Sequence, residues 1–290
     1  MKKLIIALLT LVLFTSCGSN ADDSKVKVGD VYYSDGTTAH VDSRNKSKDN
    51  QVAGFVVSIK NGKPAVIMCR KASFDVTENA MNSYYMNQNE RGIFFPSRRV
   101  FDSEGNELSR TDISGKDSYL QYLEYKESYL QDGNYETFKL KSSYYTWIDS
   151  LNNPEDENYV ALPDGIMWYI PTKFELLANK DKKGNYPYVN CFGNFQKGKS
   201  KEEIKEFCGE EISTERQDDS FYNRCYEFLS STLRISPANN NPEGKQELCE
   251  VVGYFDTFYS VNHVYDHEWL DDKAPDRDGN FVGIAFAEVN

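Results

Sequence analysis

The sequence predicts one α+β domain, and three observations lead to that prediction. Residues 52–59 and 64–69 are strand-like runs joined by Asn61-Gly62, a strong signal for a tight hairpin. Residues 117–130 carry apolar side chains at helical spacing, and residues 281–289 form an apolar, aromatic closing strand. Because these signals occur in one chain without an internal repeat or a clear linker, a single α+β unit is the simplest account.

Shorter elements are predicted between these. Residues 26–33 predict a short strand that ends at the turn Ser34-Asp35-Gly36. The other predicted pieces are short strands at 92–95, 98–101 and 250–260, a turn at 103–106, and loops at 37–50 and 239–244.

The predicted helix over residues 117–130 has two neighbouring stripes of side chains. Leu120, Leu123 and Leu130 form one stripe, and Tyr122, Tyr125 and Tyr129 form the other. We expect the leucine stripe to face the core and the tyrosine stripe to form its rim. The alternative is a tyrosine surface that stacks on sugars. A second helix is predicted over residues 142–151.

The stretch DGIMWYIPTKFELL combines a strand-like run with the start of a helix. Trp168 lies in the apolar run, and Pro171 ends that run and favours extended backbone before it. Thr172 is a natural N-cap, and Glu175 three residues later completes a capping box. A helix is therefore predicted over residues 173–179.

Composition excludes some classes of function. The formal net charge is −12 and the sequence pI is about 4.9. Such a balance opposes binding to nucleic acids and to anionic membrane surfaces, which require basic patches, so no nucleic-acid partner is expected. The hydrophobic content of 39% indicates a folded core, and the simplest interpretation of the acidic surface is solubility.

The N-terminus has the pattern of a lipoprotein signal peptide. A positive pair, Lys2-Lys3, precedes an apolar segment over residues 4–14, which is too short for a bilayer that needs about 20 residues. The following Phe14-Thr15-Ser16-Cys17 resembles a bacterial lipobox, although Phe14 replaces the usual aliphatic residue. This resemblance implies removal of residues 1–16 and lipidation of Cys17. The alternative is ordinary secretory cleavage, with Cys17 as an incidental thiol.

Residues 17–26 have the composition of a flexible tether. The acidic pair Asp22-Asp23 within it resembles the surface-export signal of Bacteroidetes lipoproteins. Together these features predict a protein that is anchored by lipid in the outer membrane and faces the cell exterior, with residues 27–290 as its folded domain.

Four cysteines in the second half of the chain are candidates for disulfides, because an exported protein enters a compartment that permits them. They are Cys191, Cys208, Cys225 and Cys249. Four cysteines allow three pairings, and all three stay open at this point. Cys69 lies in an apolar run and is expected to be a buried free thiol.

Two groups of residues are candidates for metal binding. Carboxylates crowd before Gly279-Asn280, at Asp271, Asp272, Asp276 and Asp278. Calcium is the metal that such a cluster suits, although the spacing differs from an EF-hand and Asp278-Gly279 also suits a hairpin turn. His263 and His267 would share one face of a helix and hold a metal there. Surface histidines in a loop are the favoured interpretation, and apart from calcium no cofactor is expected.

No catalytic constellation stands out. The chain has no Gly-x-Ser-x-Gly nucleophile elbow and no glycine loop for phosphate, and His40 lies in a predicted loop without an identifiable partner. A binding protein rather than an enzyme is therefore the favoured interpretation.

Five segments occur in an order that is shared with a known family. They are GDVYYSDGT at 29–37, GFVV at 54–57, WYIPTKFEL at 168–176, YEFLSST at 226–232 and GIAFA at 283–287. The order resembles a group of bacterial surface domains that includes the Lcl C-terminal-like domain and the Fibrobacter-type major paralogous domain. The last two segments depart from the family, since Glu227-Phe228-Leu229 stands where one tryptophan is expected and the final arginines are missing. Residues 72–141 look like an insertion.

The resemblance implies a C-type-lectin-like fold, shared with formylglycine-generating enzymes. Such a fold has a mixed, mostly antiparallel sheet, two or more helices and long loops. The copper-binding cysteine pair of those enzymes has no convincing counterpart here. With the lipobox, the resemblance predicts a surface protein that binds a glycan or an extracellular or host protein. The alternatives are a structural or accessory subunit of a surface assembly or nutrient-uptake system and, less favoured, an extracellular hydrolase.

Overall fold

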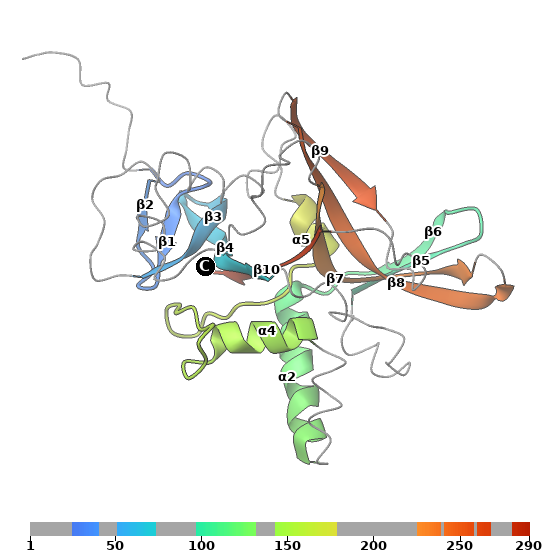
Figure 1. Ribbon diagram of the computed structural model, residues 1–290, viewed down its shortest axis with the longest axis horizontal. Coiled ribbons are helices and arrows are strands. Elements are labelled where there is room, and N and C mark those ends of the chain that lie inside the picture. Colours follow the sequence, from blue (N-terminus) through green and yellow to red (C-terminus); the bar gives the residue numbers. More distant parts are fainter. Residues whose placement is uncertain are drawn as a thin grey trace, which may run out of the picture.

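The computed structural model describes residues 25–40, 51–73, 97–131, 143–178, 225–238, 241–257, 260–267 and 280–290. Within these ranges the protein has an α+β fold (Figure 1). The strands are β1 (Val31–Tyr33), β2 (Thr38–Ala39), β3 (Val52–Lys60), β4 (Lys63–Ser73), β5 (Ser97–Phe101), β6 (Glu107–Thr111), β7 (Cys225–Ala238), β8 (Asn241–Thr257), β9 (Ser260–His267) and β10 (Asn280–Glu288). The helices are α2 (Gly115–Gln131), α4 (Ser143–Asn152) and α5 (Lys173–Ala178).

The strands form one sheet in the order β2-β1-β3-β4-β10-β7-β5-β6, and β8 joins β7 to β9 outside this path. Most pairs are antiparallel, but β7 runs parallel to both β10 and β5. Hairpin β5–β6 therefore lies at the opposite end of the sheet from β1 and β2, as Figure 1 shows. The predicted mixed, mostly antiparallel α+β architecture is confirmed.

The hairpin β3–β4 is confirmed at the predicted turn. Asn61 has φ 54° and Gly62 has φ 75°, so both central residues adopt the left-handed conformation that the tightest hairpin turns require. Within this hairpin Gly54 pairs with Cys69, whose side chain is buried as expected.

Helices α2 and α4 pack through buried tyrosines rather than leucines. The side chains of Tyr119 and Tyr122 are 3% and 0% exposed, whereas Leu120 is 39% exposed. The prediction that the leucine stripe faces the core and the tyrosines form its rim is therefore wrong for Leu120 and Tyr122, whereas Leu123 and Tyr125 are both partly buried against the core. The reason is that α4 supplies Tyr145, whose ring lies 4.5 Å from that of Tyr122, and a carboxylate for the tyrosine hydroxyls.

That carboxylate is Asp149 of α4. It accepts hydrogen bonds from Tyr119 at 2.8 Å and Tyr122 at 2.6 Å, and it pairs with Lys126 at 2.6 Å. Burial, together with the negative charge of Asp149, raises the pKa of Tyr119 and Tyr122 far above the usual tyrosine value. Both hydroxyls therefore stay protonated and donate, which joins α2 to α4 through satisfied buried groups.

Helix α4 is in turn attached to the sheet by Tyr144. Its hydroxyl donates to the Ile284 carbonyl at 2.8 Å and accepts from the Ile284 N–H at 3.0 Å. Both groups belong to β10, so the Tyr144 hydroxyl supplies a hydrogen-bond partner to the N–H and to the carbonyl of Ile284.

Two predicted loops are wrong in part, because polar residues within them form strands. Residues 38–39, inside the predicted loop 37–50, form β2. The turn predicted at 103–106 is confirmed, and β6, for which no strand was predicted, follows it. Strand β8 begins at Asn241, inside the predicted loop 239–244. Pairing with a neighbouring strand satisfies their backbone groups whatever their side-chain preference, and sequence propensity does not show that.

None of the helices in the part of the chain that the structure describes has the length and hydrophobicity to cross a membrane.

Candidate functional site

The segment Trp168–Leu176 is the junction between helices and sheet. The Trp168 side chain is fully buried, and its indole Nε1–H donates to the Val160 carbonyl at 2.9 Å. Its backbone N–H donates to Asn152 Oδ1 at 2.9 Å, and its carbonyl accepts from Asn152 Nδ2 at 3.0 Å. The next residue, Tyr169, forms a bridge with Phe286 of β10. The predicted strand-like run therefore adds one antiparallel bridge to the sheet, beside β10.

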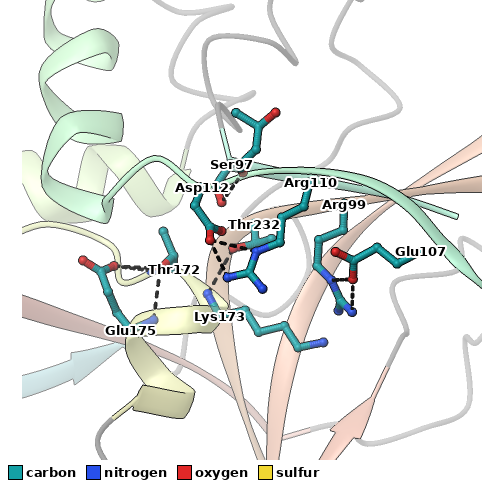
Figure 2. Close-up of polar contacts among 10 residues, drawn as sticks. Ser97, Arg99, Glu107, Arg110, Asp112, Thr172, Lys173, Glu175 and Thr232 are labelled. Atoms are coloured by element: carbon teal, nitrogen blue, oxygen red, sulfur yellow. Dashed lines mark hydrogen bonds and ion pairs between the residues drawn. The ribbon is translucent and has the colours of Figure 1, made fainter.

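The capping box at the start of α5 is confirmed. The Thr172 N–H donates to Glu175 Oε2 at 2.7 Å, and the Glu175 N–H donates to Thr172 Oγ1 at 3.1 Å, as Figure 2 shows. Glu175 also accepts from the Gly115 N–H at 3.1 Å, so its carboxylate caps α2 as well. A Cβ on Gly115 would lie 2.1 Å from the Ile170 carbonyl oxygen, so only glycine allows this approach.

Glu175 makes stability depend on pH. Burial raises the pKa of the Glu175 carboxyl above its ordinary value of 4.5, although hydrogen bonds from Thr172 and Gly115 oppose that rise. The folded state therefore holds this proton more tightly than the unfolded state. The stabilisation from it is complete below pH 4.5 and is lost as pH rises through the raised pKa.

We expect the unfolding free energy of the wild type, relative to Glu175→Gln, to fall as pH rises from about 4.5 through the raised pKa. The amide does not titrate, so the variant lacks this slope. Urea denaturation at a series of pH values measures the difference. Glu155→Gln, at an exposed glutamate, is the control and should run parallel to the wild type. Parallel curves for Glu175→Gln would contradict the assignment.

Strand β7 approaches the same junction from a distant part of the sequence. The Ser231 N–H donates to the Pro171 carbonyl at 2.9 Å, and the Ser231 hydroxyl donates to the Ile170 carbonyl at 3.2 Å. Thr232 Oγ1 accepts from the Lys173 N–H at 3.0 Å. The Ser-Ser-Thr run thus binds the backbone on both sides of Pro171, and Trp168, Pro171, Thr172 and Glu175 have structural roles.

Next to this junction lies a row of arginines that sequence reasoning did not single out. Arg110 of β6 pairs in register with Arg99 of β5, and Arg99 pairs with Arg234 of β7. Residues at paired register positions lie on the same face of a sheet. We call these three positions the arginine row. Arg99 lies in the strand that the sequence predicts over residues 98–101, but only the register shows that Arg110 and Arg234 line up with it.

Aromatic rings support two members of the arginine row. The Arg110 guanidinium carbon lies 3.5 Å from the centroid of the Phe174 ring, and that of Arg99 lies 4.8 Å from the Phe101 ring. Such contacts are favourable cation–π interactions. Figure 2 shows Arg99 and Arg110 beside each other, with α5 close by.

Two carboxylates contact the same arginines. Arg99 donates to Glu107 Oε2 through Nε at 2.8 Å and Nη2 at 2.7 Å. Arg110 donates to Asp112 Oδ2 through Nε at 2.8 Å and also through Nη2. The Arg110 and Asp112 side chains are 44% and 47% exposed, so this pair is open to solvent.

His40 has a partner, contrary to the sequence prediction. Its Nδ1 lies 2.7 Å from Asp30 Oδ1, and Asp30 Oδ2 accepts from the Lys27 N–H at 2.7 Å. The Asp30 side chain is 7% exposed and that of His40 is 23% exposed. This pair ties the start of the domain to the segment after β2.

Of the two groups predicted to bind metal, the structure describes only the histidine pair. His263 and His267 lie in β9, so the predicted loop is wrong, and the helical alternative is wrong as well. Asp271, Asp272, Asp276 and Asp278 lie outside the described residues. Among the residues that are described, no three His, Cys, Asp or Glu side chains group as metal ligands.

The strand register bears on the disulfide candidates. Cys225 pairs with Phe255, whereas Cys249 pairs with Leu233. Cys249 and Phe255 are six residues apart, which corresponds to roughly 20 Å along β8. A disulfide needs Cα atoms within about 7 Å, so this register excludes a Cys225–Cys249 bridge. Cys17, Cys191 and Cys208 lie outside the described residues.

We therefore expect any bridge from Cys225 or Cys249 to end at a different cysteine, with Cys191 and Cys208 as the remaining candidates. Peptide mapping of the unreduced protein by mass spectrometry tests this, with a reduced and alkylated sample as control. A peptide that links Cys225 to Cys249 would contradict the register.

Comparison of the chain with protein-family models, with curated proteins and with solved structures gives no match.

Proposed function

We propose that this chain is a lipid-anchored cell-surface binding protein that recognises a glycan or an extracellular protein. The proposed location is inferred from the sequence, which has the Lys2-Lys3 pair, the short apolar segment and the lipobox cysteine Cys17. A lipidated protein with a polar tether after its anchor is held at the membrane while its domain stands in solvent.

We also propose that the domain is C-type-lectin-like. The segments that carry the resemblance contact one another in the fold, which supports this. Strand β1 pairs with β3, Tyr169 bridges to Phe286 of β10, and Ser231 of β7 binds the Pro171 carbonyl. Because these segments pack together in one core, their shared order along the chain has a structural explanation.

The observation that carries the binding function is the surface of hairpin β5–β6. Every residue of β6 is exposed, and Leu108 is 65% exposed. Arginines held against aromatic rings lie on the same hairpin. Arginine and aromatic side chains are over-represented among the residues that dominate binding energy at interfaces. This hairpin is our candidate ligand surface.

A second function, a subunit of a surface assembly or nutrient-uptake system, has its own support. Strand β6 ends the sheet order, so one side of its backbone has no strand partner among the described residues. Exposed edge strands pair readily with a strand of another chain. Co-purification of a stoichiometric partner in mild detergent would favour this function over ligand binding.

Labelling with a fatty-acid analogue tests the anchor. We expect the wild type to incorporate label and to sediment with membranes, and Cys17→Ser to lose both properties. Cys69→Ser is the control, because that buried thiol is not a lipidation site. Label on Cys17→Ser, or its absence from the wild type, would overturn the anchor.

Binding is tested on glycan and matrix-protein panels, with calcium and then with chelator. Binding that requires calcium would assign a role to the carboxylates of residues 271–278, and binding that ignores chelator would favour hairpin β5–β6. Failure of the wild type to bind any member of either panel would count against the proposed binding function.

A further inference from the structure

We propose that the end of the domain where the tether enters lies on the anionic phospholipid headgroups of the membrane that holds the anchor. This inference rests on the proposed lipidation of Cys17, and it adds an orientation and a class of lipid. We call this part of the surface the lysine end. It consists of Lys27, Lys60 and Lys63 with the apolar side chains of Val28 and Ile59.

The length of the tether keeps the lysine end near the membrane. Lys25 is the first residue that the structure describes, and it lies eight residues after Cys17. Whatever its conformation, a chain of eight residues spans at most about 28 Å. An acylated Cys17 lies at the bilayer surface, so the start of the folded domain stays within that distance of the headgroups.

Hydrogen bonds and strand register bring the residues of the lysine end together. The Gly29 N–H donates to the Val56 carbonyl at 2.8 Å, which holds the turn over residues 27–30 beside β3. Four residues further along β3 is Lys60, which pairs with Lys63 across the hairpin turn. Four residues of a strand correspond to roughly 13 Å. The two turns are therefore close enough to contact one patch of membrane surface.

The lysine end is a local cluster of cations in an acidic protein. The chain carries −12 overall, yet Lys27, Lys60 and Lys63 are exposed and form no ion pair within the part of the chain that the structure describes. Asp30 is only 7% exposed, and its carboxylate already contacts the Lys27 N–H and His40. An anionic membrane attracts this end and repels the acidic remainder, so the charge distribution favours one orientation.

Two apolar side chains accompany the lysines. Val28 and Ile59 are each 37% exposed, and they are two of the four exposed large hydrophobic side chains among the described residues. Apolar side chains next to lysines are typical of surfaces that lie at the boundary between headgroups and acyl chains. The lysine stem packs along the apolar surface there while its ammonium group reaches a phosphate.

The lysine end is separate from the candidate ligand surface. Strand β6 lies five positions from β3 in the sheet order, which corresponds to about 24 Å between them. Figure 1 shows hairpin β5–β6 on the far side of the sheet from β3. Membrane contact at the lysine end therefore leaves this hairpin accessible to a ligand.

The test is lysine labelling of the full lipidated protein on vesicles. The protein is added to preformed vesicles of phosphatidylcholine, with or without phosphatidylglycerol, and treated with a membrane-impermeant amine-acylating reagent. Mass spectrometry then gives the reaction rate at each lysine. We expect Lys27, Lys60 and Lys63 to react at least about threefold more slowly on the anionic vesicles. High salt should remove the difference.

Matched controls come from the same strand. Lys71 lies on β4 eight residues after Lys63, or roughly 26 Å away, so its rate should be equal on both kinds of vesicle. Lys60→Gln combined with Lys63→Gln should restore fast labelling of Lys27 on anionic vesicles. Lys71→Gln removes one lysine from the other end of β4 and should leave Lys27 protected.

Flotation of the vesicles separates this inference from the proposed anchor. Protein that does not float with the vesicles would overturn the anchor and the inference together. Protein that floats, but whose Lys27, Lys60 and Lys63 react equally on both kinds of vesicle, would overturn the lysine end and keep the anchor. Equal slowing at Lys71, or a Lys27 that stays protected in the double variant, would also overturn the lysine end.

Discussion

Replacing Trp168 by alanine is expected to lower the free energy of unfolding by about 3–5 kcal/mol. The side chain is fully buried and belongs to the hydrophobic core. Asn152 of α4 clamps its backbone, and the adjacent Tyr169 bridges to β10. Because these elements are already fixed by other bonds, they collapse little into the vacated space, and the cavity cost is large.

Trp168→Phe separates packing from hydrogen bonding. It keeps most of the apolar volume but removes the indole donor from the Val160 carbonyl, so we expect a smaller loss of about 1–3 kcal/mol. Trp147→Phe is the control, because Trp147 is only partly buried. Urea denaturation followed by circular dichroism measures all three variants. A loss at Trp168→Ala no larger than that at Trp147→Phe would contradict the central role of Trp168.

Gly54→Ala is expected to destabilise the protein by about 3 kcal/mol, at the upper end for overpacked sites. A Cβ at Gly54 would lie 2.0 Å from the Met68 carbonyl oxygen and 2.9 Å from its carbonyl carbon. These are backbone atoms of β4, which pairs with β3 on one side and β10 on the other. The clash is therefore not relieved by turning a side chain, and the strands must separate.

Ser58→Ala is the matched control for this prediction, because it lies on the same strand and adds no atom. We expect it to change the midpoint of urea denaturation little, and Gly54→Ala to lower it clearly. Equal midpoints for Gly54→Ala and the wild type would show that β3 and β4 do not approach as closely as described.

Local sequence determined the elements whose bonds close within a few residues. Asn61-Gly62 produced the hairpin turn, because only a few residue types accept positive φ at both positions. Thr172 and Glu175 produced a capping box, because both hydrogen bonds span three residues. The lipobox at Cys17 is likewise a local pattern, and lipidation stays a prediction because that residue lies outside the described ranges.

Tertiary structure decided what depends on distant neighbours. Tyr122 is buried instead of Leu120 because α4 brings Asp149 to its hydroxyl. Glu175 accepts a hydrogen bond from the N–H of Gly115, which lies 60 residues away, and so caps helix α2 as well as α5. The arginine row exists only through the pairing of β6, β5 and β7. Burial and register arise from the whole packed chain, and no local pattern of side chains contains them.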